Sequence, residues 1–316
     1  MKILITGIHG FVGSNLVEAL KKEHTIYGLD IISPIKDGMR FTFSWDSLDR
    51  PNEIPNIDAI IHLAGKAHDT KNQSAADVYF KINTDLTKKI YDYFLKSKAK
   101  KFIFFSSVKA AADRVEGEYV DENVAPSPVG PYGESKIAAE EYIRSKEDER
   151  IKLDKETYIL RPCMIHGPGN KGNLNLLYGV VKKGIPWPLG AFENKRTFMS
   201  IDNLCFIING LLTNDVESGI YHVNDDDPVS TNELIDIICS AMGKKAHIWR
   251  IPRGLMEGVA KIGGALHLPL NPERLQKLTE NYVSSNAKIK KALGVEELPV
   301  KAKDGLLKTI KSFEGR

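Results

Sequence analysis

Short apolar segments alternate with helical patterns along the first half of the chain. The segment Lys2–Thr6 is apolar and β-branched, and Phe11, Leu16, Val17 and Leu20 then recur at helical spacing. Further strands are predicted at 25–30, 40–45, 58–65, 101–105, 157–162 and 219–223, and further helices at 82–95 and from 131. This alternation is typical of a parallel sheet that is covered by helices on both faces.

The alternation becomes less regular after residue 166. Residues 170–190 are rich in glycine and proline, 198–212 returns to helical spacing, and the chain from Ser230 onward is mostly helical. We therefore expect an α/β fold, namely a doubly wound parallel sheet with a smaller, interleaved C-terminal lobe. The predicted division assigns 1–166 and the returning 196–224 to the sheet domain, and 167–195 and 225–316 to the lobe.

Three glycines at GxxGxxG spacing separate the first strand from the first helix. Gly7 allows a tight turn, Gly10 lets the backbone approach a pyrophosphate, and Gly13 permits close packing of helix on strand. The N–H groups and positive dipole end of this helix, where Phe11 and Val12 stand, would face the phosphates. Because the turn directly follows an amino-terminal strand, a dinucleotide site is favoured over a purely structural turn.

An acidic residue and a second strand end complete the predicted dinucleotide site. Asp30 stands about 20 residues beyond the glycine turn, where a carboxylate can accept hydrogen bonds from ribose hydroxyls. The same carboxylate would repel a 2′-phosphate, so NAD is favoured over NADP; the simpler alternative is that Asp30 caps a strand. Another strand ends in Leu63, Ala64 and Gly65, where small residues would let the cofactor lie against the backbone.

Composition argues against several classes of protein. Basic residues exceed acidic ones by only three among 316, which gives no reason to expect nucleic acid or an anionic membrane as a partner. No apolar run reaches the length of a membrane-spanning helix, and 254–270 is better explained as a surface or lobe helix than as an anchor. The first apolar run is too short for a signal peptide, so we expect a cytoplasmic protein without membrane insertion.

The cysteines and histidines do not suggest a metal site. Cys163, Cys205 and Cys239 lie far apart in apolar stretches, so we expect buried free thiols in a reducing compartment. His62 and His68 have no third ligand at a useful spacing, and we interpret them as polar loop residues.

A tyrosine and a lysine form the strongest candidate for catalysis. Tyr132 and Lys136 lie four residues apart at a predicted helix start, so their side chains share one face. A free tyrosine has a pKa of about 10, but a nearby ammonium and a positively charged nicotinamide would favour the phenolate. Ser107 ends a strand at the crevice where open parallel sheets bind ligands, and it can hydrogen-bond the same substrate oxygen.

Together these features resemble the extended short-chain dehydrogenases, specifically the nucleotide-sugar epimerase/dehydratase group. The resemblance covers nearly the whole chain and implies an NAD-dependent enzyme with a Rossmann fold. It also implies a homodimer that pairs the helices following Asn83 and Tyr132. The motifs are GIHGFVG (7–13), Asp30, DAIIHLAG (58–65), Asn83, FIFFSSV (102–108), YGESK (132–136), RPCMIHGPGNKGN (161–173) and RTFMSID (196–202).

The resemblance implies roles for the central residues. Tyr132 matches the tyrosine that transfers a proton. Lys136 matches the lysine that binds the nicotinamide ribose and lowers the pKa of that tyrosine. Ser107 matches the residue that holds the sugar hydroxyl, and Asn83 matches an asparagine near the cofactor ribose.

The resemblance also implies substrate contacts. Asn173 and Arg196 match positions that contact the diphosphate of the nucleotide, which a guanidinium can clamp bidentately. Arg274 fits its motif poorly, so we expect a structural salt bridge there.

Some positions depart from the family pattern. Sugar 4,6-dehydratases carry an acidic pair after the catalytic serine or threonine, where this chain has Val108 and Lys109, so elimination is not expected. Met164 and His166 replace residues that are common in relatives, and Lys66 lies one place from a lysine that helps to hold the cofactor in some epimerases. The identity of the sugar therefore stays open.

The predicted reaction is oxidoreduction at C4 of a UDP-linked sugar in surface-polysaccharide biosynthesis. Tyr132 removes the C4 hydroxyl proton while hydride passes to NAD; a 4-epimerase, the favoured alternative, returns the hydride to the other face of the sugar. A reductase of UDP-4-keto-6-deoxy sugars would start from the keto sugar instead. A catalytically silent NAD-binding regulator and a carbonyl reductase of small ketones are further alternatives, and the intact Ser107, Tyr132 and Lys136 argue against the regulator.

Overall fold

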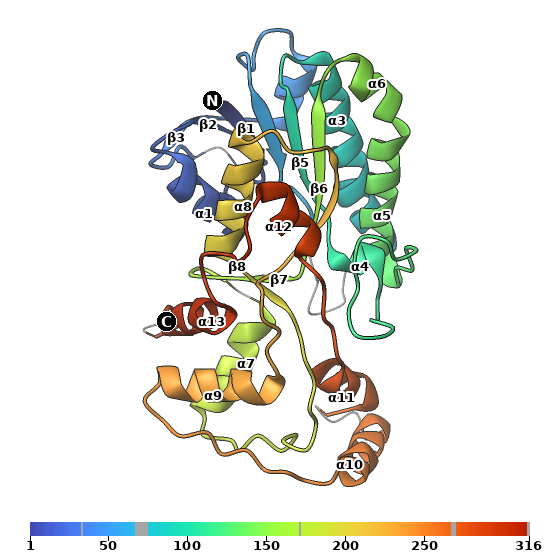
Figure 1. Cartoon of the computed structure of the whole chain (residues 1–316), viewed down its shortest axis with the longest axis vertical. Helices are drawn as coiled ribbons and strands as arrows, with labels where there is room; N and C mark the ends of the chain where they lie inside the picture. The colour runs from blue at the N-terminus through green and yellow to red at the C-terminus, as the bar shows by residue number, and fades with distance from the viewer. Residues whose placement is uncertain (33, 67–74, 171, 267–269, 315–316) are drawn as a thin grey trace.

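The computed structural model describes residues 1–32, 34–66, 75–170, 172–266 and 270–314. Within these residues, seven strands form one parallel sheet in the order β3-β2-β1-β4-β5-β6-β9 (Figure 1). The strands are β1 (Lys2–Thr6), β2 (Thr25–Leu29), β3 (Met39–Phe43), β4 (Ala59–His62), β5 (Lys101–Phe105), β6 (Glu156–Pro162) and β9 (Gly219–Val223). The predicted parallel sheet is confirmed, and its strand order reverses between β1 and β4, where sheets of this type bind ligands.

Helices cover both faces of this sheet because its strands are apolar on both sides. Ile3 and Ile5 of β1 pack into one apolar cluster, and Leu4 between them packs into another on the opposite face. The covering helices are α1 (Phe11–Leu20) and α8 (Ile201–Thr213) on one face and α3 (Leu86–Lys96) and α5 (Gly130–Ser145) on the other (Figure 1). The doubly wound arrangement predicted from the sequence is thus confirmed.

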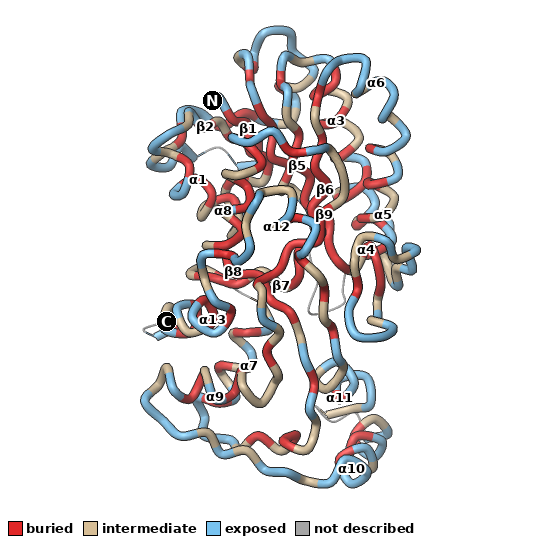
Figure 2. Tube along the Cα trace, viewed as in Figure 1, coloured by how far each residue is buried: buried red, intermediate tan, exposed pale blue. Residues whose placement is uncertain are grey.

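A smaller helical lobe lies below the sheet in Figure 1 and has its own apolar core, visible as buried segments in Figure 2. Leu174, Trp187, Ile238 and Leu306 are among the residues of that core. The lobe contains α7 (Asn173–Lys182), α9 (Thr231–Ala241), α10 (Arg253–Ala265), α11 (Pro272–Thr279) and α13 (Ala302–Lys311).

A two-stranded parallel sheet joins the lobe to the large sheet. It consists of β7 (Met164–His166) and β8 (Phe198–Ser200). The division of the chain into two domains stays a prediction, and α12 (Ala287–Leu293) packs against β9 and α8 although it follows the lobe in sequence. The remaining short elements are η1 (Trp45–Asp49), α2 (Ala76–Tyr79), η2 (Phe80–Asp85), α4 (Val108–Ala111) and α6 (Glu147–Lys152).

Several elements differ from the sequence prediction. The helix predicted at 82–95 begins earlier, at Ala76, and passes through the π-helical η2 before it continues as α3. The segment 198–212 begins with a strand, and α7 lies inside the region rich in glycine and proline. In the described parts of the chain, no helix is long and apolar enough to cross a bilayer.

The cysteines are free thiols, but they are not equally buried. Cys163 and Cys239 are buried as predicted, whereas Cys205 is only half-buried. Burial raises the pKa of all three thiols, to about 11 for Cys163 and about 12 for Cys205, so each is protonated at neutral pH.

Candidate active site

The glycine turn after β1 brings helix α1 close to two strand ends. Gly7 has a φ of +67°, and a Cβ there would lie 2.9 Å from the backbone nitrogen of Ala64. A Cβ on Gly13 would lie 2.5 Å from the carbonyl oxygen of Ile8. Neither position has room for a side chain, because the turn, α1 and the end of β4 are in backbone contact. Gly10 is the N-cap of α1.

The residues predicted around the glycine turn lie beside it. The Asp30 carboxylate accepts a hydrogen bond from the His9 backbone N–H at 3.1 Å, so it faces the turn from the end of β2. Phe11 lies against the segment after β7, since a Cβ on Gly169 would be 3.6 Å from its ring. Val12 is half-buried beside the core. The sequence motif at 161–173 therefore meets the glycine turn in space.

The end of β4 meets the catalytic candidates. A Cβ on Gly65 would lie 3.0 Å from Asn83 Oδ1 and 3.1 Å from Lys136 Nζ. The Ala64 N–H donates to the Thr6 hydroxyl at 3.0 Å, which fixes this strand end against β1. Leu63 packs against the core on the α1 side. The predicted cofactor residues and the tyrosine–lysine helix thus share one edge of the sheet.

Asn83 joins the loop after β4 to helix α5. It is fully buried, its amide donates to the Ser135 hydroxyl at 3.0 Å and to the Lys66 carbonyl at 3.1 Å, and its Oδ1 accepts from the Lys66 N–H at 2.7 Å. Both amide protons of Asn83 are therefore used within the protein. Asn83 stands in the π-helical η2, and such segments are frequent at functional sites.

Lys136 is buried and held in place by the backbone. Its Nζ donates to the Phe105 carbonyl at 2.8 Å, at the end of β5. Burial lowers the pKa of Lys136 to about 8, while the charge of Glu140 acts in the opposite direction. The ammonium is therefore the main form at neutral pH, but it can lose its proton at mildly alkaline pH.

Ser107 and Tyr132 meet at this same edge. Ser107 is buried at the start of α4, and its hydroxyl accepts the Lys109 N–H at 3.2 Å. Burial raises the pKa of Tyr132, a hydrogen bond with the Ser107 side chain lowers it, and the Tyr79 phenol raises it. The net shift in the Tyr132 pKa is upward, opposite to the effect of Lys136 expected from the sequence. The Lys136 ammonium donates to the Phe105 carbonyl.

Tyr79, beside the tyrosine, is missing from the sequence prediction, whereas Lys66 is compared there with a cofactor-holding lysine of some epimerases. Tyr79 is buried, and its ring stands edge-on to that of Tyr132 with centroids 6.5 Å apart. Lys66 Nζ lies 5.7 Å from the centroid of the Tyr79 ring. The spacing of Tyr79 four residues before Asn83 is a helical signal that could have identified it.

A buried ion pair lies behind the catalytic candidates. Arg161 of β6 donates to Glu140 of α5 through Nε at 3.0 Å and Nη2 at 2.6 Å, and Ser106 donates to the same carboxylate. Both charged side chains are at least 98% buried. Sequence reasoning missed this pair, although Glu140 follows Lys136 at helical spacing. The carboxylate links the serine strand end to the lysine helix.

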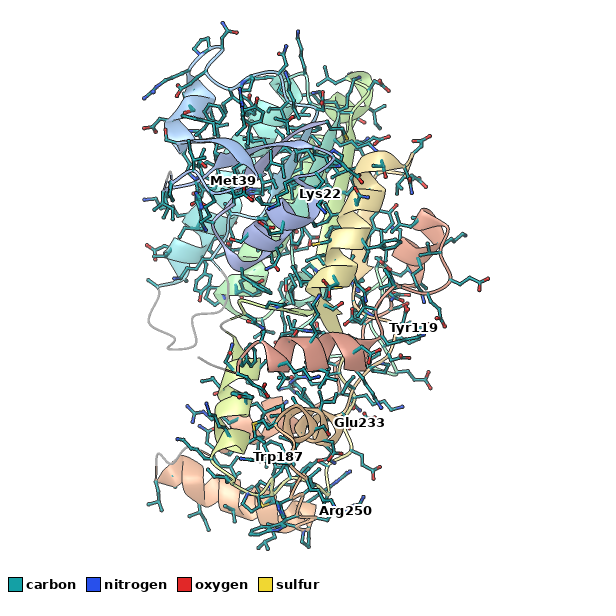
Figure 3. All side chains as sticks on the ribbon, turned by 90° about the vertical axis from the view of Figure 1, so that its left-hand side faces the viewer. Lys22, Met39, Tyr119, Trp187, Glu233 and Arg250 are labelled. Carbon is teal, nitrogen blue, oxygen red and sulfur yellow. The ribbon has the colours of Figure 1, made fainter. Side chains whose placement is uncertain are left out.

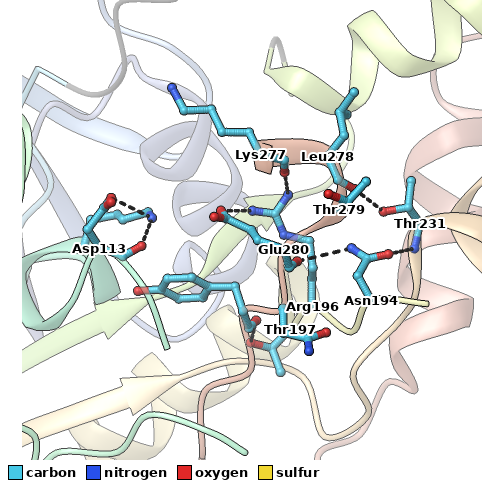
Figure 4. Close-up of polar contacts among 12 residues, drawn as sticks. Asp113, Asn194, Arg196, Thr197, Thr231, Lys277, Leu278, Thr279 and Glu280 are labelled. Atoms are coloured by element: carbon cyan, nitrogen blue, oxygen red, sulfur yellow. Dashed lines mark hydrogen bonds and ion pairs between the residues drawn. The ribbon is translucent and has the colours of Figure 1, made fainter. Parts of the chain in front are cut away.

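Arg196 lies between the two parts of the molecule, just before β8. Its Nη1 donates to the Lys277 carbonyl at 2.9 Å, and its Nη2 lies 3.4 Å from Glu280 Oε1 (Figure 4). Burial lowers the pKa of Arg196, and Glu280 acts in the opposite direction. The guanidinium is half-buried and paired with one carboxylate.

Arg196 is connected to the catalytic strand end through Tyr282. The Tyr282 hydroxyl donates to the Ala112 carbonyl at 2.7 Å beside α4, while its backbone N–H donates to the Lys195 carbonyl at 2.8 Å. One side chain therefore spans the distance between α4 and the segment that carries Arg196. The segment that carries Arg196 is therefore hydrogen-bonded, through Tyr282, to the loop that follows Ser107 and α4.

Two other candidate residues lie on lobe helices. Asn173 is exposed at the first position of α7. Arg274 is exposed on α11, and its charge lowers the pKa of Glu273, although less than Lys277 does.

The positions that would carry the acidic pair of a dehydratase have other surroundings. Val108 is buried, and Lys109 Nζ lies 3.1 Å from Asp113 Oδ1 and 4.5 Å from the centroid of the Tyr282 ring. The lysine charge is thus compensated locally. Neither residue carries the carboxyl group that the acidic pair of a dehydratase would supply.

The prediction that His62 is a polar loop residue is wrong. His62 ends strand β4 and is buried, with Nδ1 2.7 Å from the Thr6 hydroxyl and Nε2 2.9 Å from the Thr87 hydroxyl. Burial and then the Lys136 charge lower its pKa to about 3, so it is a neutral core residue. His68 lies outside the described residues. Among the described residues, no group of three metal-ligating side chains is placed to hold an ion.

Comparisons with known proteins add three findings. The model of the NAD dependent epimerase/dehydratase family matches residues 3–223. A UDP-glucose 4-epimerase of Vibrio cholerae is 32% identical over 265 residues, which cover 79% of this chain and 78% of that protein. An N-acetyl-α-D-glucosaminyl-diphospho-ditrans,octacis-undecaprenol 4-epimerase of Escherichia coli O157:H7 is 27% identical over 300 residues, covering 92% of this chain and 84% of that protein.

The solved structures agree on the fold. MoeE5 in complex with UDP-glucuronic acid and NAD superposes with a TM-score of 0.75 at 18% identity, covering 99% of each chain. The large sheet and the helical lobe are therefore shared with that protein.

Proposed function

The chain belongs to the NAD dependent epimerase/dehydratase family, and we propose on that premise that it is a 4-epimerase of a UDP-linked sugar that uses NAD. The observation that carries this proposal is the convergence of Ser107, Tyr132 and Lys136 beside Gly65 at the switch point of the sheet. Elements distant in sequence bring together a proton-transferring phenol, a hydroxyl and an ammonium.

The glycine turn and the end of β2 fit NAD. The turn lacks side chains where backbone contacts are closest, and α1 begins at Phe11 without a side-chain cap on its first N–H groups, which suits a pyrophosphate. The Asp30 carboxylate faces this turn and would accept hydrogen bonds from the adenosine ribose. NAD held there would supply the hydride acceptor and donor for C4 of the sugar.

The remaining chemistry belongs to side chains of the protein. Ser107 would hold the C4 hydroxyl, and Tyr132 would remove its proton and later return one to the same oxygen. Because burial raises the pKa of Tyr132, the phenolate needs positive charge close by. Lys136 supplies part of that charge from its fixed position on the Phe105 carbonyl, where it would also bind the nicotinamide ribose.

Arg196 and Asn173 would bind the diphosphate of the substrate. Arg196 is now paired with Glu280, and an incoming diphosphate would replace this carboxylate with a stronger bidentate partner. Asn173 contributes the first position of α7, where the helix dipole also favours anions. The substrate would then lie between the lobe and the carboxyl edge of the sheet.

Epimerisation is favoured over reduction and elimination. The two relatives described above are 4-epimerases, and the buried Val108 and paired Lys109 leave no acid–base pair for a dehydratase. A 4-ketoreductase would use the same residues, so the distinction depends on the product. We propose that the reaction serves surface-polysaccharide biosynthesis, as the sequence resemblance implies.

A second candidate substrate is a sugar linked through diphosphate to a polyprenol. The relative that covers 92% of this chain is named for such a substrate. An exposed apolar face on α10, described below, gives a specific reason to test it. Arg196 would bind the diphosphate in either case.

The decisive experiment follows the product by NMR. The purified protein is incubated with NAD and a panel of UDP-sugars, UDP-4-keto sugars and a polyprenyl-diphospho sugar, and the configuration at C4 is read out. We expect Tyr132→Phe to lower kcat by about 100-fold to 10,000-fold with little change in NAD binding, because only proton transfer is lost. Tyr119→Phe, a matched change at an exposed site (Figure 3), should have no effect.

Two outcomes would contradict the proposal. Near-normal turnover by Tyr132→Phe would exclude this tyrosine as the proton-transferring group. NAD binding without turnover of any substrate in the panel would favour a regulatory protein instead.

A further inference from the structure

Helix α10 carries an apolar face that nothing in the described chain covers. Leu255, Val259, Ile262 and Leu266 are 60%, 45%, 62% and 64% exposed. Their spacing of four, three and four residues places them on one stripe of the helix and its C-cap, about 17 Å long. The side of α10 that packs into the lobe is a different one, formed by Met256, Ala260 and Gly263.

The segment of sequence that contains this stripe is strongly basic. Residues 242–266 contain five basic side chains and one acidic one, Glu257, although the whole chain has an excess of only three basic groups. Trp249 is 56% exposed in the same segment. The five basic residues are all exposed: Lys244, Lys245, Arg250, Arg253 and Lys261.

This segment lies at the end of the lobe that is farthest from the sheet. Figure 1 shows α10 there, and Figure 3 shows Arg250 at the same end of the molecule. Helix α11 packs against α10 from one side, and a pocket of about 300 Å³ lies between them, lined in part by Phe192 and Leu275. Lys261 also lines this pocket, whereas the four apolar residues of the stripe do not and are exposed among the described residues.

We propose that α10 and residues 244–250 dock the lobe on an anionic phospholipid surface. An amphipathic helix with exposed leucine and isoleucine on one face, in a segment that also carries a tryptophan, lysines and arginines, is suited to lie in the plane of a membrane interface. The apolar stripe would enter the headgroup boundary, and the basic side chains would contact lipid phosphates. The helix would lie on the membrane without crossing it.

The charge distribution favours lipid over a second copy of the chain. In a two-fold interface each surface meets the same surface of its partner, so the basic groups would face one another. Like charges in contact would oppose such a dimer, whereas anionic lipid neutralises them.

Vesicle sedimentation of the full chain tests this docking without any turnover. The protein should sediment with vesicles of phosphatidylcholine and phosphatidylglycerol, and far less with phosphatidylcholine alone. Leu255→Ser combined with Ile262→Ser should lower vesicle binding at least about tenfold. Ile151→Ser with Leu153→Ser, at exposed apolar residues of the sheet domain, is the matched control and should bind normally.

Charge variants and particle mass complete the test. Arg250→Glu with Lys261→Glu should remove the preference for phosphatidylglycerol, and added salt should weaken wild-type binding. Equal binding by the serine variant and the wild type, with circular dichroism showing both folded, would overturn the proposal. A fall in particle mass by light scattering without loss of vesicle binding would overturn it too, because the stripe would then join two copies.

Discussion

Burial at the carboxyl edge of the sheet shifts the pKa values of both Tyr132 and Lys136. Burial raises the pKa of the phenol and lowers that of the ammonium, so both groups are pushed toward their neutral forms. The proton transfer proposed for the Tyr132 phenolate requires the opposite trend in both pKa values. A positively charged partner and the hydroxyl of Ser107 must therefore compensate for burial during proton transfer.

The pH dependence of turnover should report Lys136. Its pKa of about 8 predicts that kcat/KM falls above that pH, as the ammonium that supports the phenolate is lost. Lys136→Arg keeps the charge at alkaline pH, so the decline should disappear, although the altered geometry lowers the maximal rate. The measurement is kcat/KM from neutral to alkaline pH. An unchanged decline in the variant would assign it to another group.

Lys136 should also affect stability in a defined pH window. The unfolded chain holds this proton up to its usual pKa of 10.5, whereas the folded protein releases it from about pH 8. Between these values the unfolded state binds more protons, so the contribution of Lys136 to stability rises with pH. Below pH 8 Lys136 is charged in the folded protein, so the full cost of burying its ammonium lowers the free energy of unfolding.

For individual residues, the sequence predicts the candidate catalytic side chains but not the buried ion pair that packs behind them. Ser107, Tyr132 and Lys136 follow from a strand end and a helical spacing, and the structure brings them together. Arg161 and Glu140 escape such reasoning, because a strand residue and a helix residue meet only through tertiary packing. The raised pKa of Tyr132 likewise depends on burial, which spacing does not reveal.

Among the elements, α1 depends on a glycine for its distance from β1. Gly13→Ala would place a Cβ 2.5 Å from the Ile8 carbonyl oxygen, so α1 must shift away from the turn. We expect a loss of roughly 1–3 kcal/mol in the free energy of unfolding and weaker NAD binding. Gly179→Ala in α7 is the matched control, since its Cβ meets no atom within 4 Å, and it should gain about 0.5–1 kcal/mol.

Urea unfolding and NAD titration measure both effects. A Gly13→Ala protein as stable as the wild type, with normal NAD affinity, would show that the turn tolerates a side chain and would remove this support for the dinucleotide site.

Helix α5 and strand β6 are joined by the buried pair of Glu140 and Arg161. Glu140→Gln leaves the arginine charge uncompensated and should lower the free energy of unfolding by about 3 kcal/mol; adding Arg161→Met should restore part of it. The variant should also shift the alkaline decline of kcat/KM to lower pH, because Glu140 raises the pKa of Lys136. Glu297→Gln, in an exposed pair with Lys301, should leave the free energy of unfolding almost unchanged, because solvent screens the pair.

Denaturant unfolding and the pH profile test this pair separately. A large stability loss with an unchanged pH profile would show a structural role only, and an unchanged stability would contradict the importance of the pair altogether.

Elements of the sheet were easier to predict than those of the lobe. Strands such as Lys101–Phe105 are continuous apolar runs, because both of their faces are buried. Helix α7 was missed because Gly172, Gly179 and Gly184 give its surroundings the composition of a loop. The sequence predicts helix at Phe198–Ser200, where the structure has a strand, since three residues are too few to show a period of two.

In the whole molecule, the junction between sheet and lobe is polar and highly connected. The buried Asp225 carboxylate accepts hydrogen bonds from the Ser200 backbone and hydroxyl and from Asn203 at 2.7 Å. Tyr282 makes a second connection between α4 and the lobe segment. These hydrogen bonds join the segment that carries Arg196, the proposed diphosphate ligand, to the edge of the sheet that carries Ser107, the proposed sugar ligand.

We expect a homodimer whose interface is formed by the outer helices of the sheet domain, α3 and α5. Tyr142 of α5 donates to Asp92 of α3 at 2.6 Å, and Lys88 lies 5.7 Å from the centroid of the Tyr142 ring, so α3 and α5 form one platform. We expect two such platforms to pack across a two-fold axis. Light scattering at micromolar concentration should give twice the 35.2 kDa of one chain.

A pair of variants separates this interface from the lobe surface. Ala138→Arg places a long charged side chain at a half-buried position of α5, where a neighbouring helix would approach, and it should produce monomers with intact circular dichroism. Leu176→Arg, at an exposed residue of α7, should leave the dimer unchanged. The Leu255→Ser, Ile262→Ser protein should also stay dimeric, because α10 lies at the far end of the lobe. A wild-type mass of one chain would contradict the dimer, and monomers only in the α10 variant would move the interface to the lobe.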